Sequence, residues 1–233
     1  MVKSMKERLE LLLDDKLDIV INKTVLIIGL GGVGSYALET LARTYINNLI
    51  IVDSDKIDIS NLNRQIMTNI DNIGKYKTHV WCERIKKINP NCNIKMITEF
   101  ITKDNLDLLF EDKVDYVIDA CDTLETKKEI IKYCLNNKIK FISSMGMANR
   151  IDATKIKISN LDKTCYDPLA KKLRNIIKKE KIEGKIPVVY SEEQPKKIKK
   201  LGSIAHVVAT SGILCTNYII NDIIKEVNYE GTN

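Results

Sequence analysis

Residues 25–65 read VLIIGLGGVGSYALETLARTYINNLIIVDSDKIDISNLNRQ and decide the fold. A short apolar run ends at Gly29, apolar residues at helical spacing follow the glycines, and a second apolar run ends at Asp53. This order predicts a strand, a glycine turn, a helix and a second strand. Gly31 and Gly32 let the backbone approach a phosphate group, and the N-terminus of the helix attracts anions. Because Asp53 lies where a carboxylate can bind ribose hydroxyls, the stretch predicts a nucleotide site.

The composition is that of a folded protein of the cytoplasm. The 233 residues are 44% hydrophobic, which suits one domain with a substantial core. The apolar runs are too short to cross a bilayer, and the N-terminal MVKSMKERLELLL lacks the apolar segment of a secretory signal. The six cysteines show no CxxC spacing, which argues against structural zinc and favours free thiols in a reducing compartment. We therefore expect a cytoplasmic protein with no membrane partner.

The positive charge is concentrated in the second half of the chain. The formal net charge is +6, and residues 155–200 are dense in lysine, whereas the N-terminal half is nearly balanced. Such asymmetry favours a polyanionic partner. A solvated, lysine-rich surface would give the same composition, so charge alone leaves both interpretations open.

Polar side chains follow the second predicted strand. The segment 55–65 crowds Asp, Ser, Asn, Arg and Gln behind a strand end, where open α/β sheets place ligand contacts. The planar guanidinium of Arg64 can bridge two phosphate oxygens. Lys77 opens a predicted helix over residues 78–88, where a cation does not stabilise the helix dipole. Either a bound anion or an ordinary surface position explains Lys77.

The next predicted elements continue the alternation of strands and helices. Because successive strands of this kind are most simply parallel, the first part of the chain predicts a Rossmann-like, mainly parallel α/β sheet flanked by helices. Asp119 and Asp122 lie at the C-terminal end of one of these strands, where carboxylates can hold a magnesium ion. The strands are expected over residues 94–100, 114–120 and 140–144, and the helices over residues 105–110 and 127–136.

From residue 147 the sequence predicts a C-terminal extension of extra strands and helices. Its first helix is amphipathic and very basic, with Lys171, Lys172 and Arg174 off the apolar face. A lysine tract over residues 196–200 precedes the last helix, which contains too many Ser, Thr, Asn and Asp residues for a membrane anchor. We expect His206 to be structural. The strands are expected over residues 153–158 and 187–193, and the helices over residues 169–181 and 207–224.

Four segments, GLGGVGS, DSDKIDISNLNRQ, GKYK and DACD, resemble the adenylating enzymes related to ubiquitin activation, including the ThiF and MoeB types. The resemblance covers residues 8–144. It implies ATP and Mg²⁺ as cofactors, with Asp122 at the magnesium position and catalytic roles for Arg64, Lys77 and Asp122. It also implies a homodimer in which Arg8 reaches the partner's ATP site. The implied ATP contacts are Arg8, Gly29, Gly31, Gly32, Asp53, Asp55, Asn61, Arg64, Gln65, Lys77 and Asp122.

The second half of the chain resembles one branch of these enzymes, the tRNA threonylcarbamoyladenosine dehydratases. The similar segments are SMGMANRIDATKIKISNLDKTCYDPLAKKLR, VVYSEE and GSIAHVVATSGILCTNYIINDII. The resemblance then covers nearly the whole chain and implies a single ThiF-type domain. Residues 1–146 would form its ATP-binding half, and residues 147–233 its basic half for substrate binding and dimerisation.

The branch implies ATP-dependent cyclisation, a dehydration, of threonylcarbamoyladenosine next to the tRNA anticodon. The side-chain carboxylate is adenylated, and intramolecular ring closure then releases AMP, which is a far better leaving group than a carboxylate oxygen. Closure of this kind needs no protein thiol, so no role is required of Cys165. Lys171, Lys172 and Arg174 would supply cations for the tRNA phosphates.

Two other functions share parts of this pattern. An adenylyltransferase that activates the C-terminus of a ubiquitin-like sulfur-carrier protein would use the same ATP site, although that branch typically carries paired zinc cysteines. A nicotinamide oxidoreductase would bind NADH and would not need Arg64, Lys77 or Asp122. The sequence leaves open which tRNA species is used, whether a monovalent cation binds, and whether a sulfur- or redox-related protein is a partner.

Overall fold

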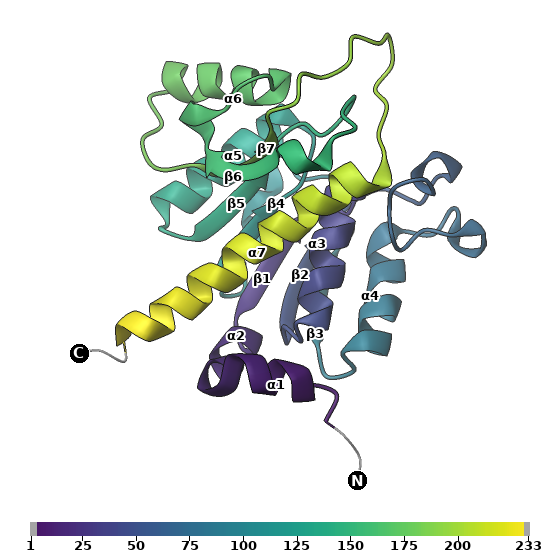
Figure 1. Ribbon diagram of the computed structural model, residues 1–233, viewed down its shortest axis with the longest axis vertical. Coiled ribbons are helices and arrows are strands. Elements are labelled where there is room, and N and C mark those ends of the chain that lie inside the picture. Colours follow the sequence, from purple (N-terminus) through teal and green to yellow (C-terminus); the bar gives the residue numbers. More distant parts are fainter. Residues whose placement is uncertain (1–3, 231–233) are drawn as a thin grey trace.

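The computed structural model describes residues 4–230, which form a seven-stranded sheet between two helical layers (Figure 1). The strand order is β3-β2-β1-β4-β5-β7-β6, and neighbouring strands are parallel except for β6, which runs antiparallel to β7. The predicted mainly parallel α/β fold is confirmed. The strands are β1 (Thr24–Ile28), β2 (Asn48–Val52), β3 (Asn93–Ile97), β4 (Tyr116–Asp119), β5 (Lys140–Ser144), β6 (Ile156–Asn160) and β7 (Pro187–Ser191).

Helices cover both faces of this sheet. The helix predicted over residues 105–110 differs in type from the one observed. Lys103–Phe110 is a 3-10 helix, and Asn105 interrupts it with non-helical backbone angles. The N-terminal helical segment is divided as well, because a 3-10 turn over Asp14–Lys16 separates α1 from α2. The α-helices are α1 (Glu7–Leu13), α2 (Leu17–Ile21), α3 (Gly32–Arg43), α4 (Lys77–Ile88), α5 (Leu124–Asn136), α6 (Pro168–Lys179) and α7 (Ala205–Glu230).

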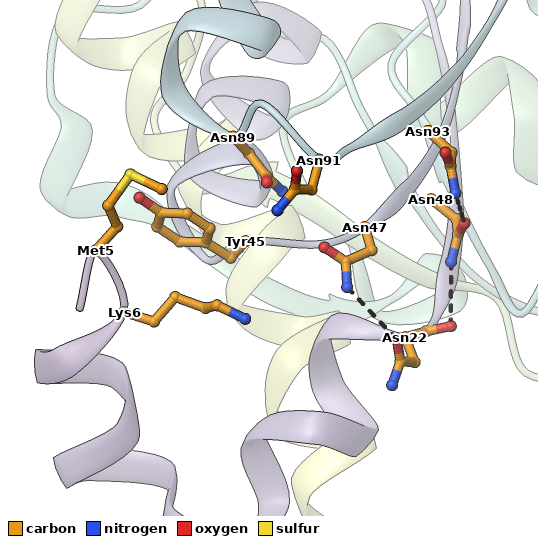
Figure 2. A pocket seen from close by; sticks show the side chains of 9 residues that line it. All are labelled: Met5, Lys6, Asn22, Tyr45, Asn47, Asn48, Asn89, Asn91 and Asn93. Atoms are coloured by element: carbon orange, nitrogen blue, oxygen red, sulfur yellow. Dashed lines mark hydrogen bonds between the residues drawn. The ribbon is translucent and has the colours of Figure 1, made fainter.

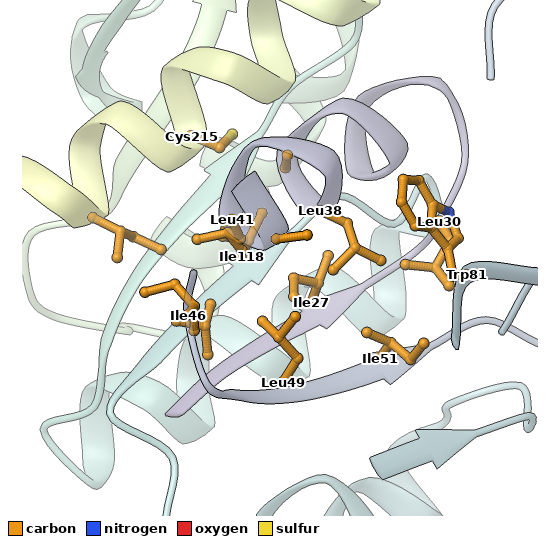
Figure 3. Packing of buried hydrophobic residues seen from close by; sticks show 14 of the residues in the cluster. Ile27, Leu30, Leu38, Leu41, Ile46, Leu49, Ile51, Trp81, Ile118 and Cys215 are labelled. Carbon is orange, nitrogen blue, oxygen red and sulfur yellow. The ribbon is translucent and has the colours of Figure 1, made fainter. Parts of the chain in front are cut away.

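Successive residues of the central strands face opposite helical layers. In β1, Ile27 belongs to the apolar cluster that contains residues of α3, α4 and α7, whereas Leu26 belongs to the cluster with residues of α5 and α6. Figure 3 shows the first cluster, with Ile27, Leu38 and Trp81 among its members. Because both faces of these strands are buried, the sequence reads as continuous apolar runs rather than as alternation.

The C-terminal extension continues the same sheet. β7 lies beside β5, and β6 forms the edge. β6 begins later than predicted because the Asp152 carboxylate accepts a hydrogen bond from the Thr154 amide at 2.9 Å and caps a 3-10 turn. β7 ends earlier than predicted because Glu193 turns back, and its carboxylate accepts a hydrogen bond from the Asp152 amide at 2.8 Å.

α7 returns across the sheet and packs against α3 (Figure 1). Over Ala205–Glu226 its mean hydropathy of 1.4 and its length would suffice for a membrane span, but Cys215 and Ile219 on this helix are fully buried in the core. The two helices approach closely at Gly212, where an added Cβ would lie 2.8 Å from the Ala37 nitrogen. Glycine at this position therefore sets the distance between α7 and α3.

Replacing Gly212 by alanine is expected to destabilise the fold by about 1–2 kcal/mol. Alanine favours a helix by about 1 kcal/mol over glycine. The added Cβ would however meet backbone atoms of Val33 and Ala37 on α3, so forcing the two backbones apart costs about 2–3 kcal/mol, the upper part of the usual range for overpacking. Urea unfolding should show a lower midpoint at unchanged slope. Gly202→Ala is the control, since a Cβ there meets its nearest atoms at 3.6 Å. An unchanged midpoint for Gly212→Ala would show that α7 is not closely packed.

Candidate functional site

The strand order reverses between β1 and β4, and open α/β sheets bind ligands at such a point. Ile28, the last residue of β1, is in register with Val52 of β2 and with Asp119 of β4. The glycine turn, Asp53 and Asp122 therefore follow three adjacent strand ends. Their proximity results from the parallel topology, which brings segments distant in the sequence to one edge.

Two glycines leave no room for a side chain, Gly29 in the glycine turn and Gly34 in the first turn of α3. Gly29 has a left-handed φ of +85°, and a Cβ there would lie 2.8 Å from the Ala120 carbonyl oxygen. A Cβ at Gly34 would lie 2.9 Å from the Gly29 carbonyl carbon. The turn ends at Gly31, which is the N-cap of α3. The first amides of this helix thus lie at the strand ends, where they can donate hydrogen bonds to an anion.

Asp53, Asp55 and Lys77 form an ion-paired cluster beside this turn. The Leu30 amide donates to Asp53 Oδ2 at 2.7 Å, which fixes the carboxylate against the glycine turn. Lys77 Nζ lies 2.7 Å from Asp55 Oδ2 and 3.4 Å from Asp53 Oδ2. Lys77 is only 4% exposed, so these two carboxylates balance its charge. The Asp55 side chain is 68% exposed and can turn outward when a phosphate approaches the lysine.

Asn61, Arg64 and Gln65 lie on the segment that follows β2. Arg64 donates to the Ser60 carbonyl oxygen at 2.6 Å and to Asn63 Oδ1 at 3.0 Å, and its side chain is partly exposed. Asn61 Oδ1 accepts a hydrogen bond from the Asp58 amide, which closes a local capping box. Gln65 is buried, and among residues 4–230 its Oε1 has no hydrogen-bond partner.

Gln65 lies beside the glycine turn. Its Nε2 is 4.0 Å from the position that a Cβ of Gly31 would take. A buried amide oxygen without a partner costs free energy, which a bound polar ligand would recover. The structure thus brings Gln65 to the turn as the sequence predicts, with unused hydrogen-bonding capacity.

The two carboxylates at the end of β4 have different surroundings. Asp119 is fully buried, and its Oδ2 accepts from Lys127 Nζ at 2.8 Å and from Ser143 Oγ at 2.6 Å. The expectation that Asp119 could hold magnesium is therefore wrong, because its oxygens are already engaged. Asp122 is exposed. Burial, with a further contribution from Asp119, raises the pKa of the Cys121 thiol well above its ordinary value, so this thiol stays protonated.

The surroundings of Asp122 are compatible with nucleotide-bound magnesium. Within residues 4–230 no group of three or more His, Cys, Asp or Glu side chains could hold a metal on its own. Magnesium that binds with a nucleotide needs only one or two carboxylates, because phosphates and water supply its other oxygens. An exposed carboxylate at a strand end beside the glycine turn provides that ligand type.

Arg8 lies apart from these residues, on the exposed side of α1. Neighbouring Lys6 lines a polar cavity of about 260 Å³ at the opposite end of the sheet (Figure 2). Asn22, Asn48 and Asn93 line the same cavity at the N-terminal ends of β1, β2 and β3, and they are joined by hydrogen bonds. The structure does not bring Arg8 to the glycine turn of its own chain.

The three basic residues predicted on α6 differ in their contacts. Lys171 and Lys172 are exposed. Arg174 instead donates to the Thr164 carbonyl oxygen at 3.0 Å and also to the Thr164 hydroxyl, so it ties α6 to the preceding turn. All six cysteines, Cys165 among them, are free. Two of the three predicted cations are thus available to a ligand, and the third serves the packing of its helix.

Arg150 is an important residue that sequence reasoning missed. It is 3% exposed and donates to the carbonyl oxygens of Gly146, of Tyr166 at 3.1 Å and of Glu193 at 3.2 Å. It also lies 3.4 Å from the carboxylate of Asp167, the N-cap of α6. Contacts with main-chain oxygens leave no sequence pattern, so only the fold reveals that Arg150 joins three loops.

Comparisons with known proteins show the family to which this chain belongs. The model of the ThiF family matches residues 5–232. A tRNA threonylcarbamoyladenosine dehydratase of Bacillus subtilis (strain 168) is 36% identical over 225 residues, which cover 88% of this chain and 89% of that protein. A protein of the same name from Haemophilus influenzae is 43% identical over 67% of this chain and 60% of its own length.

A solved structure has the same fold over nearly the full length. It is E. coli tRNA N6-threonylcarbamoyladenosine dehydratase, TcdA, in complex with ATP, with a TM-score of 0.91 and 33% identity. The match covers 98% of this chain and 99% of that chain. The chain therefore belongs to the ThiF family and, within it, to the tRNA threonylcarbamoyladenosine dehydratases.

Proposed function

We propose that this protein uses ATP to cyclise threonylcarbamoyladenosine next to the tRNA anticodon. The observation that carries the proposal is the cluster of Asp53, Asp55 and Lys77, which is fixed against a glycine turn at the strand-order reversal. A nucleotide bound there would present its phosphates to the N-terminus of α3. Membership of the dehydratase group supplies the substrate class.

The reaction has two steps, adenylation of the carboxylate and ring closure. The substrate carboxylate attacks the α-phosphorus of ATP, pyrophosphate leaves, and an acyl adenylate forms. The carbamoyl nitrogen or oxygen of the same side chain then attacks the acyl carbon, and AMP leaves with one oxygen of the former carboxylate. The carbamoyl group loses one nitrogen-bound proton, from the attacking nitrogen itself or, when oxygen attacks, from an adjacent N–H, so the modified nucleoside loses one water in total. Because the nucleophile belongs to the substrate, no cysteine of the protein needs to act.

The residues of the site have distinct roles in this proposal. Asp53 binds the ribose hydroxyls, and the amides that follow Gly31, together with Asn61 and Gln65, bind the nucleotide phosphates. Lys77 and Arg64 stabilise the charge that develops at the α-phosphate during attack and departure. For these roles Asp55 must release Lys77, and Arg64 must leave Ser60 and Asn63.

Asp122 would hold a magnesium ion that arrives with the nucleotide. When bound, magnesium neutralises phosphate charge and favours departure of pyrophosphate. The protein's own contribution is to keep an exposed carboxylate at the end of β4. The buried Lys127–Asp119 pair at 2.8 Å supports the turn that carries Asp122.

The basic half of the chain is proposed to bind tRNA. Replacing Lys171 and Lys172 together by alanine should weaken tRNA binding and lower the slope of log K against log salt by roughly 1 for each phosphate that a lysine no longer neutralises. The control is Lys132→Ala, which changes an exposed lysine on α5. Arg174→Ala should instead lower the stability of the fold. An unchanged slope for the double variant would show that α6 faces away from the tRNA.

The assembly and location follow from the same proposal. We assign ATP binding to residues 1–146, and substrate binding and dimerisation to residues 147–233, in a homodimer of the cytoplasm. Arg8 would complete the ATP site of the partner subunit, which agrees with its exposure at the far end of its own sheet. Alanine at Arg8 in one subunit of a mixed dimer should then impair the site of the other subunit.

Mass spectrometry of tRNA nucleosides tests the proposed activity. Incubation of purified protein with ATP, Mg²⁺ and threonylcarbamoylated tRNA should give a nucleoside lighter by one water, with AMP and pyrophosphate released in equal amounts. Omission of ATP should abolish the change. If AMP formed only with a Gly-Gly-ended carrier protein, or if the chain bound NADH and released no AMP, the proposed function would be wrong.

A further inference from the structure

The connection between β7 and α7 carries a cluster of positive charge. It extends beyond the sheet as a long loop at the edge where the parallel strands have their carboxyl ends (Figure 1). We use the name lysine loop for residues 196–202, which contain the exposed side chains of Lys196, Lys197, Lys199 and Lys200. Four cations so close in the sequence repel one another and favour an extended, variable loop, unless other contacts fix its path.

Asn149 fixes both ends of the lysine loop. Its carbonyl oxygen accepts from the Lys196 amide at 2.8 Å, and its own amide donates to the Gly202 carbonyl oxygen at 2.8 Å. Its side-chain Oδ1 accepts from the Gly202 amide at 2.6 Å. One residue therefore closes the base of the loop with three hydrogen bonds. Asn149 achieves this in the left-handed region, with φ of +63°, which asparagine tolerates better than most residues.

The residues that follow Asn149 contact the connection between β7 and α7 just before and just after the lysine loop. Arg150 donates to the Glu193 carbonyl oxygen at 3.2 Å, before the lysine loop begins. His206 Nε2 lies 2.8 Å from the Ile151 carbonyl oxygen, after the loop has ended. Residues 149–151 thus contact both sides of the connection, and Arg150 also ties this segment to the start of α6 through Tyr166 and Asp167.

A further contact joins the lysine loop to the candidate nucleotide site. Asn63 Nδ2 donates to the Ser203 carbonyl oxygen at 2.9 Å, directly after the loop. Arg64 donates to Asn63 Oδ1 at 3.0 Å. The backbone at the end of the lysine loop is therefore fixed beside the residues proposed to bind ATP, which places the loop next to that site.

We propose that Asn149 is a positioning residue that closes the lysine loop and so presents its four lysines to the tRNA backbone beside the adenylation site. This inference rests on the proposed function. A loop that is already closed loses less conformational freedom when phosphates bind, and this pre-organisation appears as affinity for tRNA. The role acts on substrate binding and not on the chemical step, because Asn149 contacts backbone atoms of the loop.

The variant Asn149→Gly tests the role of the Asn149 side chain without disturbing the left-handed backbone at this position. Glycine keeps the left-handed conformation but removes Oδ1, so the fold should persist while the closure has one hydrogen bond fewer. The KM for threonylcarbamoylated tRNA should rise roughly five-fold, as expected for one neutral hydrogen bond, with kcat and the Kd of ATP unchanged. Asn91→Gly, at an exposed position at the opposite end of the sheet, is the control.

A double-mutant cycle distinguishes positioning from a general structural effect. In a variant with alanine at all four lysines of the loop, Asn149→Gly should raise KM no further, since it acts only through those lysines. An unchanged KM in the single variant would overturn the inference. An equal effect in the lysine-free background would overturn it as well.

Failure of the inference can be told apart from failure of the proposed function. Direct binding of threonylcarbamoylated tRNA, measured by fluorescence anisotropy, does not depend on turnover. If wild-type protein binds this tRNA but forms no cyclic nucleoside, the proposed function is wrong, and the Asn149→Gly effect on Kd still decides the inference. If wild-type protein cyclises the nucleoside and Asn149→Gly binds tRNA equally well, only the inference is wrong.

Discussion

Asp122→Asn should lower the rate of AMP formation by about 10²–10³-fold, which is the usual effect of losing one electrostatic contact to a transition state. The exposed carboxylate at the end of β4 is proposed to hold the magnesium ion that neutralises phosphate charge. Asparagine keeps the size of the side chain but removes its negative charge, so the metal is held weakly. AMP released with threonylcarbamoylated tRNA is the quantity to measure, over a range of Mg²⁺ concentrations.

The matched control is Asp162→Asn, which removes an exposed carboxylate from the turn before α6. Both variants should unfold in urea at the wild-type midpoint, because neither side chain is buried. High Mg²⁺ should restore part of the activity of Asp122→Asn if the defect is weak metal binding. Wild-type turnover by Asp122→Asn at low Mg²⁺ would contradict the assignment of Asp122 to the metal.

Lys127→Met should lower the free energy of unfolding by about 3–5 kcal/mol, because it leaves Asp119 buried without its counter-charge. Both side chains are 0% exposed, and the ammonium lies 2.8 Å from the carboxylate. Burial has the largest single effect and would lower the pKa of Lys127, but its neighbours together, with Asp119 first among them, raise the pKa above the ordinary lysine value. The lysine is therefore charged in the folded state, and urea unfolding measures the effect of its removal.

Lys132→Met is the control, since it changes an exposed lysine on the same helix and should alter stability by no more than about 0.5 kcal/mol. Lys127→Met combined with Asp119→Leu should recover much of the lost stability, because an apolar pair no longer leaves a buried charge. If Lys127→Met alone unfolded like the wild type, the ion pair would not exist in solution.

The strands of the central sheet could be predicted because burial on both faces produces apolar runs in the sequence. β5 has the predicted bounds, Lys140–Ser144. The start of α5 was placed too late, at residue 127 instead of Leu124, because its first turns bury polar side chains such as Thr126 and Lys127. Burial of paired polar groups depends on partners from other strands, which hydrophobic periodicity does not reveal.

The candidate site was predictable where it depends on strand ends. Asp53 and Asp122 follow apolar runs, and parallel topology alone brings them to one edge. The ion pair that engages Asp119 and the contacts of Arg174 with Thr164 were not predictable, since they depend on side-chain packing. The closure of the lysine loop by Asn149 also escaped the sequence, because main-chain hydrogen bonds between distant loops leave no motif.

The central claim is that the substrate carboxylate becomes an acyl adenylate. Threonylcarbamoylated tRNA with a heavy oxygen isotope at both carboxylate oxygens tests this directly. The protein is supplied with ATP and Mg²⁺, and the products are analysed by mass spectrometry. Attack of the carboxylate on the α-phosphorus predicts AMP that contains one heavy oxygen atom, in an amount equal to the cyclic nucleoside. Heavy oxygen in inorganic phosphate with release of ADP, or AMP without the isotope, would contradict the account.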